Sequence, residues 1–269
     1  MNFNNDLKDY LEFAKQLAKD ARKIALKYYR FNTQSLNYSD KSLVSIADKE
    51  INDLVIKKIK LKYPKHGLLG EEQSWQLDKE SFWVCDPIDG TKDYLMGIPN
   101  FMFSIALVER GVPLVGVICD LANGELYYAI KNEGAYLDGK IIKVSRRILN
   151  ESWLVIPASV RRLNVNSLIY SKLIDSSYQN NVVFGYVKTG TIIAQGLADG
   201  LVLLGPTKPW DFAAVSLLVK EAGGKLTNIY NKSLCFDKSL DDGIIISNNI
   251  IHKDLITIVN GISEDRFKK

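Results

Sequence analysis

The sequence of 269 residues predicts an α+β first half followed by an α/β second half. Apolar residues first recur in steps of three and four, as they do on one face of a long helix. Short apolar runs between turn signals then indicate an antiparallel meander, because parallel neighbours would need long crossover connections. Helix and strand signals alternate after about residue 150, which favours an α/β arrangement. We therefore expect two halves, residues 1–149 and 150–269, which pack rigidly because no low-complexity linker joins them.

Two helices are expected at the start of the chain. The first follows a stripe of seven apolar positions, Leu7, Leu11, Ala14, Leu17, Ala21, Ile24 and Tyr28. The second is indicated by apolar residues between Ile51 and Ile59. It should end before Tyr63-Pro64, because proline restricts the residue that precedes it. The polar stretch 37–48 between the two helices is expected to be a loop or a hairpin.

The strands of the meander are expected between Phe82 and Val144, separated by turn signals such as Asn123-Gly124 and Asp138-Gly139. In the second half, helices are expected over residues 189–200 and 212–222 and from about His252. Gly223-Gly224 should end the second of these, because glycine is favoured after the last helical turn. Strands are expected at residues 182–184, 201–204 and 243–247.

The composition excludes several kinds of chemistry. The chain is 46% hydrophobic and 25% charged, has no long uncharged span and lacks a secretory leader, which predicts a cytoplasmic protein without a membrane segment. Two His and three Cys offer too few ligands for the common zinc sites. The net charge of +4 lies on Lys-rich helices and is typical of a solvated surface, so we expect no nucleic-acid partner. Any catalysis should therefore depend on carboxylates.

Three short acidic motifs lie where elements are expected to end or begin: Gly70-Glu71-Glu72, Asp86-Pro-Ile-Asp-Gly-Thr91 and Trp210-Asp211-Phe-Ala-Ala214. Each alone has an ordinary explanation, namely a solvated loop, a β-turn and a helix N-cap. Together they suggest a metal site, because acids brought close repel one another unless a cation offsets their charge. Hard oxygen ligands of this kind suit Mg²⁺ or Mn²⁺ better than zinc.

These motifs, in this order, resemble the signature of the inositol monophosphatase family of Mg²⁺-dependent, lithium-sensitive phosphomonoesterases. Further stretches resemble family markers and extend the likeness over nearly the whole chain: 40–48, 97–107, 221–224 and 247–248. The resemblance implies a layered αβαβα sandwich with an antiparallel sheet in the first half and a mixed sheet in the second. It also implies a homodimer that hydrolyses a small sugar or polyol phosphate resembling inositol 1-phosphate.

Other functions remain open within and beyond this family. Relatives act on fructose 1,6-bisphosphate, histidinol phosphate or adenosine 3′,5′-bisphosphate. A more remote alternative is a metal- or RNA-binding regulator that keeps the scaffold without catalysis. The sequence lacks the residues of unrelated phosphatase classes. There is no Asp-x-Asp at the acidic motif, as a haloacid-dehalogenase enzyme would need, and no Arg lies six positions after a Cys, as a cysteine phosphatase would need.

The resemblance assigns two or three metal ions, Mg²⁺ or Mn²⁺, to five residues. The first ion would be held by Glu71, Asp86 and the Ile88 carbonyl, and the second by Asp86, Asp89 and Asp211. Glu71 would also help to bind a third, weaker ion, and it counts among the catalytic residues. The implied reaction is two-metal hydrolysis of a phosphate ester.

The remaining roles concern the water and the substrate. Asp48 and Thr91 match the pair that orients and deprotonates the attacking water, and the backbone N–H groups of Gly90 and Thr91 would bind phosphate oxygens. The substrate is expected to meet six residues: Asp89, Gly190, Thr191, Ile192, Leu204 and Asp211. Inositol-specific relatives carry a glutamate where this chain has Leu204, and Ile192 is bulkier than the customary alanine. The reaction is therefore better supported than inositol as the substrate.

Overall fold

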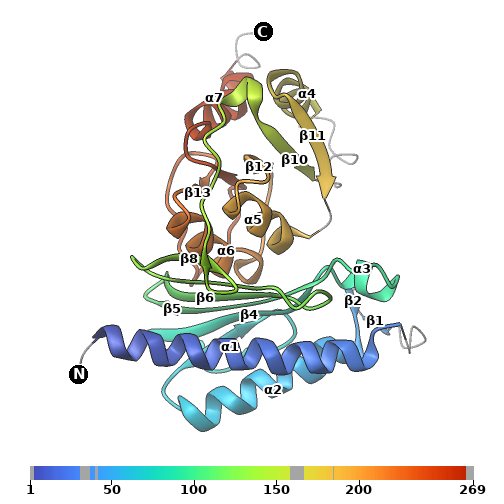
Figure 1. The fold of residues 1–269 in the computed structure, drawn as a ribbon, viewed down its shortest axis with the longest axis vertical. Coiled ribbons are helices and arrows are strands. Elements are labelled where there is room, and N and C mark those ends of the chain that lie inside the picture. Colours follow the sequence, from blue (N-terminus) through green and yellow to red (C-terminus); the bar gives the residue numbers. More distant parts are fainter. Residues whose placement is uncertain (1–2, 31–36, 40–41, 158–166, 184, 265–269) are drawn as a thin grey trace.

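The computed structural model describes residues 3–30, 37–39, 42–157, 167–183 and 185–264. Its elements stack in five layers, in which two β-sheets alternate with three layers of helices (Figure 1). The layered αβαβα sandwich is thus confirmed. The long helices, from the outer layer beside the first sheet to the layer beyond the second, are α1 (Phe3–Tyr28), α2 (Ile46–Lys62), α5 (Tyr186–Ala194), α6 (Pro209–Glu221), α4 (Ser167–Ser176) and α7 (His252–Glu264).

The first sheet has seven strands in sequential order, all formed by residues before position 142. They are β3 (Gly67–Gly70), β4 (Ser81–Asp89), β5 (Met102–Glu109), β6 (Val112–Asp120), β7 (Leu126–Ile130), β8 (Gly134–Leu137) and β9 (Lys140–Ile141). The antiparallel meander is confirmed from β4 onward. Strand β3 differs because it pairs with β4 in parallel, with Gly70 opposite Cys85. The residues between these strands turn back along the sheet edge, where Trp75 pairs with Leu68, so the chain enters β4 in the direction of β3.

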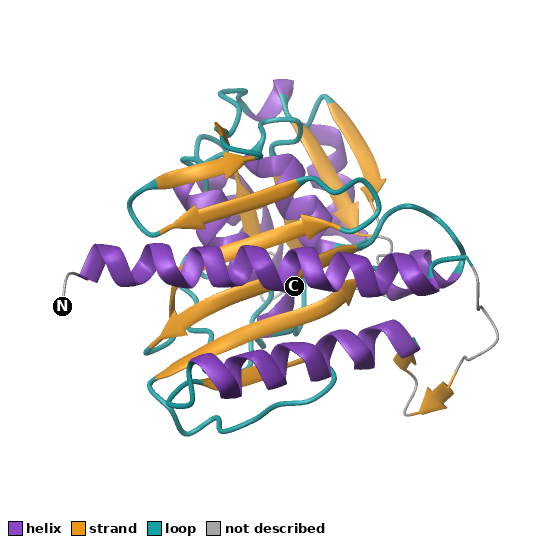
Figure 2. Cartoon of the chain, turned by 60° about the horizontal axis from the view of Figure 1, so that its bottom comes forward, coloured by secondary structure: helices purple, strands orange, loops and turns teal. Residues whose placement is uncertain are grey.

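Helices α1 and α2 cover one face of this sheet (Figure 2). The expected apolar stripe on α1 is buried from Leu7 to Ala21, and its last two members, Ile24 and Tyr28, pack partly buried against the same core. Helix α2 begins earlier than expected, because Ser45 and Asp48 form a capping box around its first turn. Before it, β1 (Asn37–Ser39) and β2 (Ser42–Val44) form the hairpin anticipated for this polar stretch. Asp40, the first residue of the family marker at 40–48, lies outside the described residues.

The second sheet is formed after residue 152 in the order β11-β10-β12-β14-β13, and it mixes parallel and antiparallel pairs. Its strands are β10 (Trp153–Pro157), β11 (Gln179–Val183), β12 (Gly200–Leu203), β13 (Lys225–Asn228) and β14 (Ile244–Ser247). The strands expected at 201–204 and 243–247 are confirmed to within one residue, and the expected strand 182–184 overlaps the end of β11. Phe184 lies outside the described residues. The division into domains at residues 149 and 150 stays a prediction.

The helices between the sheets bring the second half of the chain onto the first sheet. Helix α5 ends at Ala194, six residues before the expected stop, and Gly196 follows with a φ of 73°. Helix α6 ends before Gly223 as expected, but it begins at Pro209, where the fixed φ of proline suits a first helical residue. Buried apolar side chains of both helices, of the first sheet and of the second sheet form one continuous core. The carboxyl end of β4 meets these helices at the edge of that core.

Two short helical segments complete the described structure, α3 (Thr91–Leu95) and the 3₁₀ turn η1 (Leu149–Glu151). No helix in the described part of the chain is long and apolar enough to cross a membrane.

Candidate metal centre

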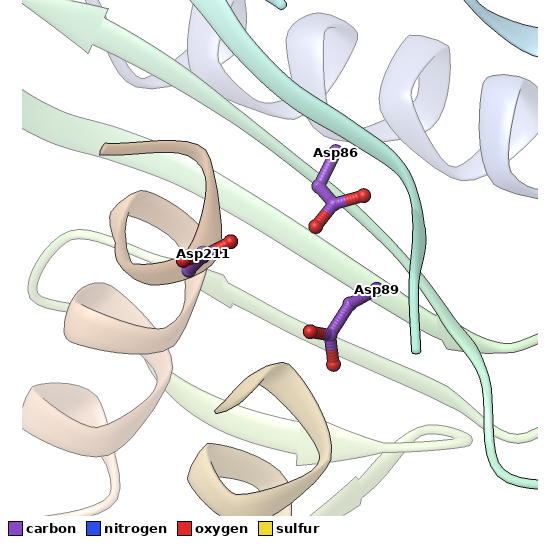
Figure 3. Close-up of side chains that lie close together, drawn as sticks. All are labelled: Asp86, Asp89 and Asp211. Atoms are coloured by element: carbon purple, nitrogen blue, oxygen red, sulfur yellow. The ribbon is translucent and has the colours of Figure 1, made fainter. Parts of the chain in front are cut away.

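Three aspartates converge where β4 ends beneath α6. Asp86 and Asp89 come from the last residues of β4, and Asp211 lies in the first turn of α6 (Figure 3). One carboxylate oxygen of each lies within 4.8 Å of the others. The strand alternation explains the direction of Asp86: Phe82 and Val84 contact the core shared with α6, so Asp86 faces the same side. The convergence expected from the sequence is therefore present.

Asp89 also binds the first turn of α5. Pro87 and Ile88 interrupt the regular pairing of β4 with β5, and Asp89 emerges from this irregularity. Its carboxylate accepts hydrogen bonds from the backbone N–H groups of Tyr186, at 3.3 Å, and Val187, at 3.1 Å. A Cβ atom on Gly185 would lie 2.7 Å from Asp89 Oδ2. Only glycine therefore allows this close approach of the α5 N-terminus to the carboxylate.

Asp211 is the third residue of α6 and not its N-cap. Lys208 has extended backbone angles and takes the N-cap position, so the ordinary explanation of Asp211 as an N-cap does not apply, although the residue lies at the expected start of a helix. The Asp211 carboxylate accepts a hydrogen bond from the backbone N–H of Lys208. This bond fixes the side chain at the start of the helix, where its charge is also favoured by the helix dipole.

A fourth carboxyl group comes from Glu71. This residue follows β3, and its backbone N–H donates to the Cys85 carbonyl at 3.2 Å, which places it beside the end of β4. Its carboxyl group shares a hydrogen bond with that of Asp86. Gly70 is required just before it, because a Cβ there would lie 2.7 Å from Asn52 Oδ1 and 2.5 Å from the Gln73 carbonyl oxygen.

Burial and mutual repulsion oppose ionisation of these four groups. Burial, with the charges of neighbouring acids, raises the pKa of Glu71 to about 7 and that of Asp89 to about 6. The pKa of Asp86 is raised well above its usual value by burial and then by the charges of Glu71 and Asp89. The pKa of Asp211 is raised in the same way by burial and by Asp89. Asp86 Oδ1 is buried and has no hydrogen-bond partner among the described residues.

These residues fit a hard divalent cation. A cation bound among close carboxylates, one of them with an unpartnered buried oxygen, would stabilise their ionised form. All of the donor atoms are oxygens, which Mg²⁺ and Mn²⁺ prefer. The Ile88 carbonyl, the remaining expected ligand, accepts a hydrogen bond from Thr91 Oγ1 at 3.0 Å. It therefore contacts the expected catalytic threonine directly.

Asp48 and Thr91 lie in the first turns of α2 and α3, beside this cluster. Asp48 is buried in the first turn of α2, where it accepts hydrogen bonds from the backbone N–H of Ser45, at 2.8 Å, and from the Ser45 hydroxyl. Burial raises its pKa to about 7, although the Ser45 hydrogen bonds lower it. Its Oδ1 has no partner within the described structure. The negative charge of Asp48 adds to the effect of burial in raising the pKa of Tyr94, which lies in the same short helix as Thr91.

Gly90 gives the chain its sharp turn from β4 into α3. Its φ of 91° lies in the left-handed region, and a Cβ there would lie 2.6 Å from the Asn100 carbonyl oxygen. Glycine is therefore required by the backbone at this position. Phosphate binding by the N–H groups of Gly90 and Thr91 stays a prediction.

The expected substrate residues of α5 and β12 occupy different surroundings. A Cβ on Gly190 would overlap the side chain of Val215, so this glycine allows α5 to pack closely against α6. Thr191 is fully buried and donates to the Lys188 carbonyl at 2.8 Å. Ile192 is partly buried against the core shared by the two sheets. Leu204 packs against the outer core beneath α4 and α7. Their contact with substrate stays a prediction.

One pair beside the cluster was not anticipated from the sequence. Lys188 Nζ, in the first turn of α5, lies 2.8 Å from Asp120 Oδ2 at the end of β6, and the Asp120 side chain is 1% exposed. Burial acts to raise the pKa of Asp120, but hydrogen bonds from Lys188 and Asn123 lower it overall. No local motif marks such a pair, because it joins the two halves of the chain. It adds a second contact between the first turn of α5 and the first sheet.

Comparison with known proteins places the chain among phosphatases over most of its length. The chain matches the inositol monophosphatase family over residues 6–264. It is 33% identical over 238 residues to inositol monophosphatase 1 of Solanum lycopersicum, covering 83% of this chain and 85% of the relative. It is 30% identical over 261 residues to a histidinol-phosphatase of Chlorobaculum parvum, covering 95% and 98%. It is 34% identical over 215 residues to a Nus factor SuhB of Xylella fastidiosa, covering 77% of each.

Solved structures show the same architecture. The IMPase of Thermotoga maritima superimposes with a TM-score of 0.84 at 26% identity, covering 96% of this chain and 99% of that one. Together, the acidic cluster, the layered fold and the match over nearly the full length identify the chain. It belongs to the inositol monophosphatase family of metal-dependent phosphatases.

Proposed function

We propose that this protein is an Mg²⁺-dependent phosphomonoesterase that hydrolyses a small sugar or polyol phosphate. The observation that carries the proposal is the convergence of Asp86, Asp89 and Asp211, whose oxygens lie within 4.8 Å of one another. The shared hydrogen bond between Asp86 and Glu71 adds a fourth acid. A protein relieved of catalysis would have little reason to keep acids that destabilise one another when no cation is bound.

The chain's own residues would divide the work in a defined way. Glu71, Asp86 and the Ile88 carbonyl would hold one ion, and Asp86, Asp89 and Asp211 a second. When bound, Mg²⁺ supplies positive charge that stabilises the entering and leaving oxygens of an in-line displacement at phosphorus.

Proton transfer falls to Asp48 and Thr91. The pKa of Asp48 is raised to about 7, so a large share of this carboxyl group is ionised at neutral pH and can accept a proton. Its Oδ1 is buried and has no hydrogen-bond partner among the described residues, so it retains an unused acceptor. Thr91 Oγ1 donates to the Ile88 carbonyl and retains lone pairs with which to orient water. The N–H groups of Gly90 and Thr91 would hold the phosphate oxygens.

Substrate choice would depend on the side of the pocket formed by the second half of the chain. Leu204 and Ile192 offer no hydrogen bond to a sugar hydroxyl. A site without such a partner discriminates weakly between alcohols of similar shape. We therefore propose a broad small-molecule specificity that includes inositol 1-phosphate but is not confined to it. A homodimer in the cytoplasm is the assembly we expect, and light scattering of the purified protein tests the dimer.

Hydrolysis of a generic phosphomonoester with Mg²⁺ and with EDTA tests the enzyme proposal. We expect activity only with Mg²⁺, and its loss in Asp211→Asn. The matched control is Asp254→Asn, because Asp254 also lies in the first turn of a helix but on an exposed surface. Folded protein without activity in either condition would refute the proposal. A comparison of kcat/KM for inositol 1-phosphate, fructose 1,6-bisphosphate, histidinol phosphate and adenosine 3′,5′-bisphosphate then identifies the substrate class.

The similarity to a Nus factor SuhB keeps a second function in view, a regulatory contact with a macromolecule. The complete set of site acids favours catalysis as the primary activity. The Asp211→Asn variant separates the two, because a regulatory contact made elsewhere would survive the loss of hydrolysis.

A further inference from the structure

A buried serine hydroxyl next to the metal centre has no hydrogen-bond partner among the described residues. Ser104 lies in the middle of β5, and the residue is 1% exposed. Burying a hydroxyl without a hydrogen bond is unfavourable, and native structures rarely leave one in this state. We therefore expect a hydrogen-bond partner for Ser104.

The sheet register identifies the nearest polar group. Ser104 is paired across the strands with Asp86 on one side and Ile118 on the other. Its neighbours on the same face of β5 are Met102 and Ala106, both part of the apolar core. Directly paired residues on one face of a sheet have Cβ atoms about 4.5–5.5 Å apart. Asp86 is thus the polar member among the four sheet neighbours of Ser104.

Asp86 carries a hydrogen-bond acceptor that lacks a donor within the described structure, which matches the unpartnered hydroxyl of Ser104. Its side chain is buried, with the residue 2% exposed, and its Oδ1 also lacks a hydrogen-bond partner in the described chain. The carboxyl group shares a hydrogen bond with Glu71. An unpartnered donor and an unpartnered acceptor therefore occupy adjacent positions on one buried face.

We propose that Ser104 is a positioning residue for the metal centre, whose hydroxyl donates to Asp86 Oδ1, directly or through one buried water, when the site is loaded with a divalent cation. This inference rests on the proposed function for the identity of the ion. A carboxylate that ligates a metal is usually held by further hydrogen bonds, and these fix its orientation. Glu71 can donate to Asp86 only while it is protonated, whereas the serine hydroxyl remains a donor when every acid in the cluster is ionised.

Two variants of equal shape test this role. Ser104→Thr keeps the hydroxyl, and Ser104→Val replaces it with a methyl group on the same branched side chain. Mg²⁺ binding is measured directly by calorimetry on metal-free protein, with no substrate present. We expect Ser104→Val to bind Mg²⁺ about 10- to 100-fold more weakly than wild type, as is typical when such a supporting partner is lost. Ser104→Thr should bind Mg²⁺ at least about tenfold more tightly than Ser104→Val does.

Kinetics separate positioning from a general loss of structure. In Ser104→Val the Mg²⁺ concentration for half-maximal activity should rise in parallel with the binding constant, while kcat at saturating Mg²⁺ changes less. Val84→Ala is the structural control, because Val84 lies on the same face of β4 and is buried in the same core. This change removes more buried volume than Ser104→Ala but no hydrogen-bond donor, so the Mg²⁺ affinity of the variant should match that of wild type. Ser104→Ala provides the same readout without added bulk if the valine variant fails to fold.

The outcomes distinguish this inference from the proposed function. Equal Mg²⁺ affinities for Ser104→Thr and Ser104→Val, or wild-type affinity in Ser104→Ala, overturn the role of the hydroxyl even if the enzyme is active. Binding of Mg²⁺ that depends on the hydroxyl supports the role even if no phosphomonoester is hydrolysed. Wild-type protein that binds no Mg²⁺ overturns both.

Discussion

Replacing one acid of the cluster should stabilise the protein without metal while weakening its response to Mg²⁺. Asp211→Asn is the informative change, because asparagine keeps the size of the side chain and can still accept the backbone hydrogen bond from Lys208. Two unit charges 4.8 Å apart repel by about 3 kcal/mol at the effective dielectric constant usual for protein sites. Partial protonation of the cluster reduces this cost, so we expect a gain of about 2 kcal/mol at pH 8. For a chain of this size the melting temperature should rise by about 4–8 °C.

The sign of the pH dependence follows from the raised pKa values. A carboxyl group whose pKa is higher in the folded state binds more protons there than in the unfolded chain, so the stability falls as the pH rises. For Asp89 and Glu71 this window runs from the ordinary carboxyl range near 4 up to about 6 and 7. Wild-type protein in EDTA should therefore be more stable at pH 5 than at pH 8. The gain from Asp211→Asn should shrink as the pH falls.

Thermal unfolding in EDTA and in Mg²⁺ measures both effects. Mg²⁺ should raise the melting temperature of wild type and of the control Asp254→Asn, and raise that of Asp211→Asn by less, because only the expected ligands of the first ion remain complete in that variant. If Asp211→Asn is less stable than wild type in EDTA at pH 8, repulsion within the cluster is not the dominant effect and the reasoning fails. Equal stabilisation of all three proteins by Mg²⁺ would show that the ion binds elsewhere.

Three further variants address the residues around the cluster. Asp89→Asn keeps an acceptor for the first turn of α5 but loses the charge, so turnover should fall by about 100-fold or more with an unchanged circular dichroism spectrum. Ser45→Ala removes the capping box, which should cost about 1 kcal/mol in a urea titration. It should also raise the pKa of Asp48 above about 7, so the acid limb of kcat/KM moves to higher pH, and an unmoved limb would contradict the role of Asp48 as a base. Gly90→Ala should destabilise the fold by about 1–3 kcal/mol, because φ is 91° and the Asn100 carbonyl blocks the new Cβ; wild-type stability would contradict this requirement.

The elements with strong local patterns were predictable from the sequence. The stripe on α1, the meander from β4 to β9 and the glycine stop after α6 each depend on residues close together in the chain. The parallel pairing of β3 with β4 was not predictable in this way, because ten residues of irregular chain decide its direction. The start of α5 was missed for a related reason. Its first turn is satisfied by Asp89, which is distant in sequence.

The acids of the cluster could be anticipated because each motif carries its own acids and backbone requirements. The glycines at 70 and 90 show this, since each faces a close backbone contact. The supporting residues could not be anticipated. The importance of Ser104 depends on the strand register, which places it opposite Asp86. That of Lys188 depends on its ion pair with Asp120, which joins the two halves of the chain. Neither relationship leaves a local signal in the sequence.

The hydrogen bonds between Asp89 and the start of α5 link metal binding with substrate choice, two properties that protein engineers usually treat as separate. Asp89 is an expected metal ligand, and its carboxylate also accepts the N–H groups that begin α5. The same helix carries Gly190, Thr191 and Ile192, which are expected to shape the alcohol side of the pocket. Substitutions that tilt α5 to admit a new alcohol would also pull on a metal ligand. Attempts to broaden or redirect the substrate range through this helix should therefore be accompanied by a changed requirement for Mg²⁺, and selection schemes would do well to vary the ion together with the substrate.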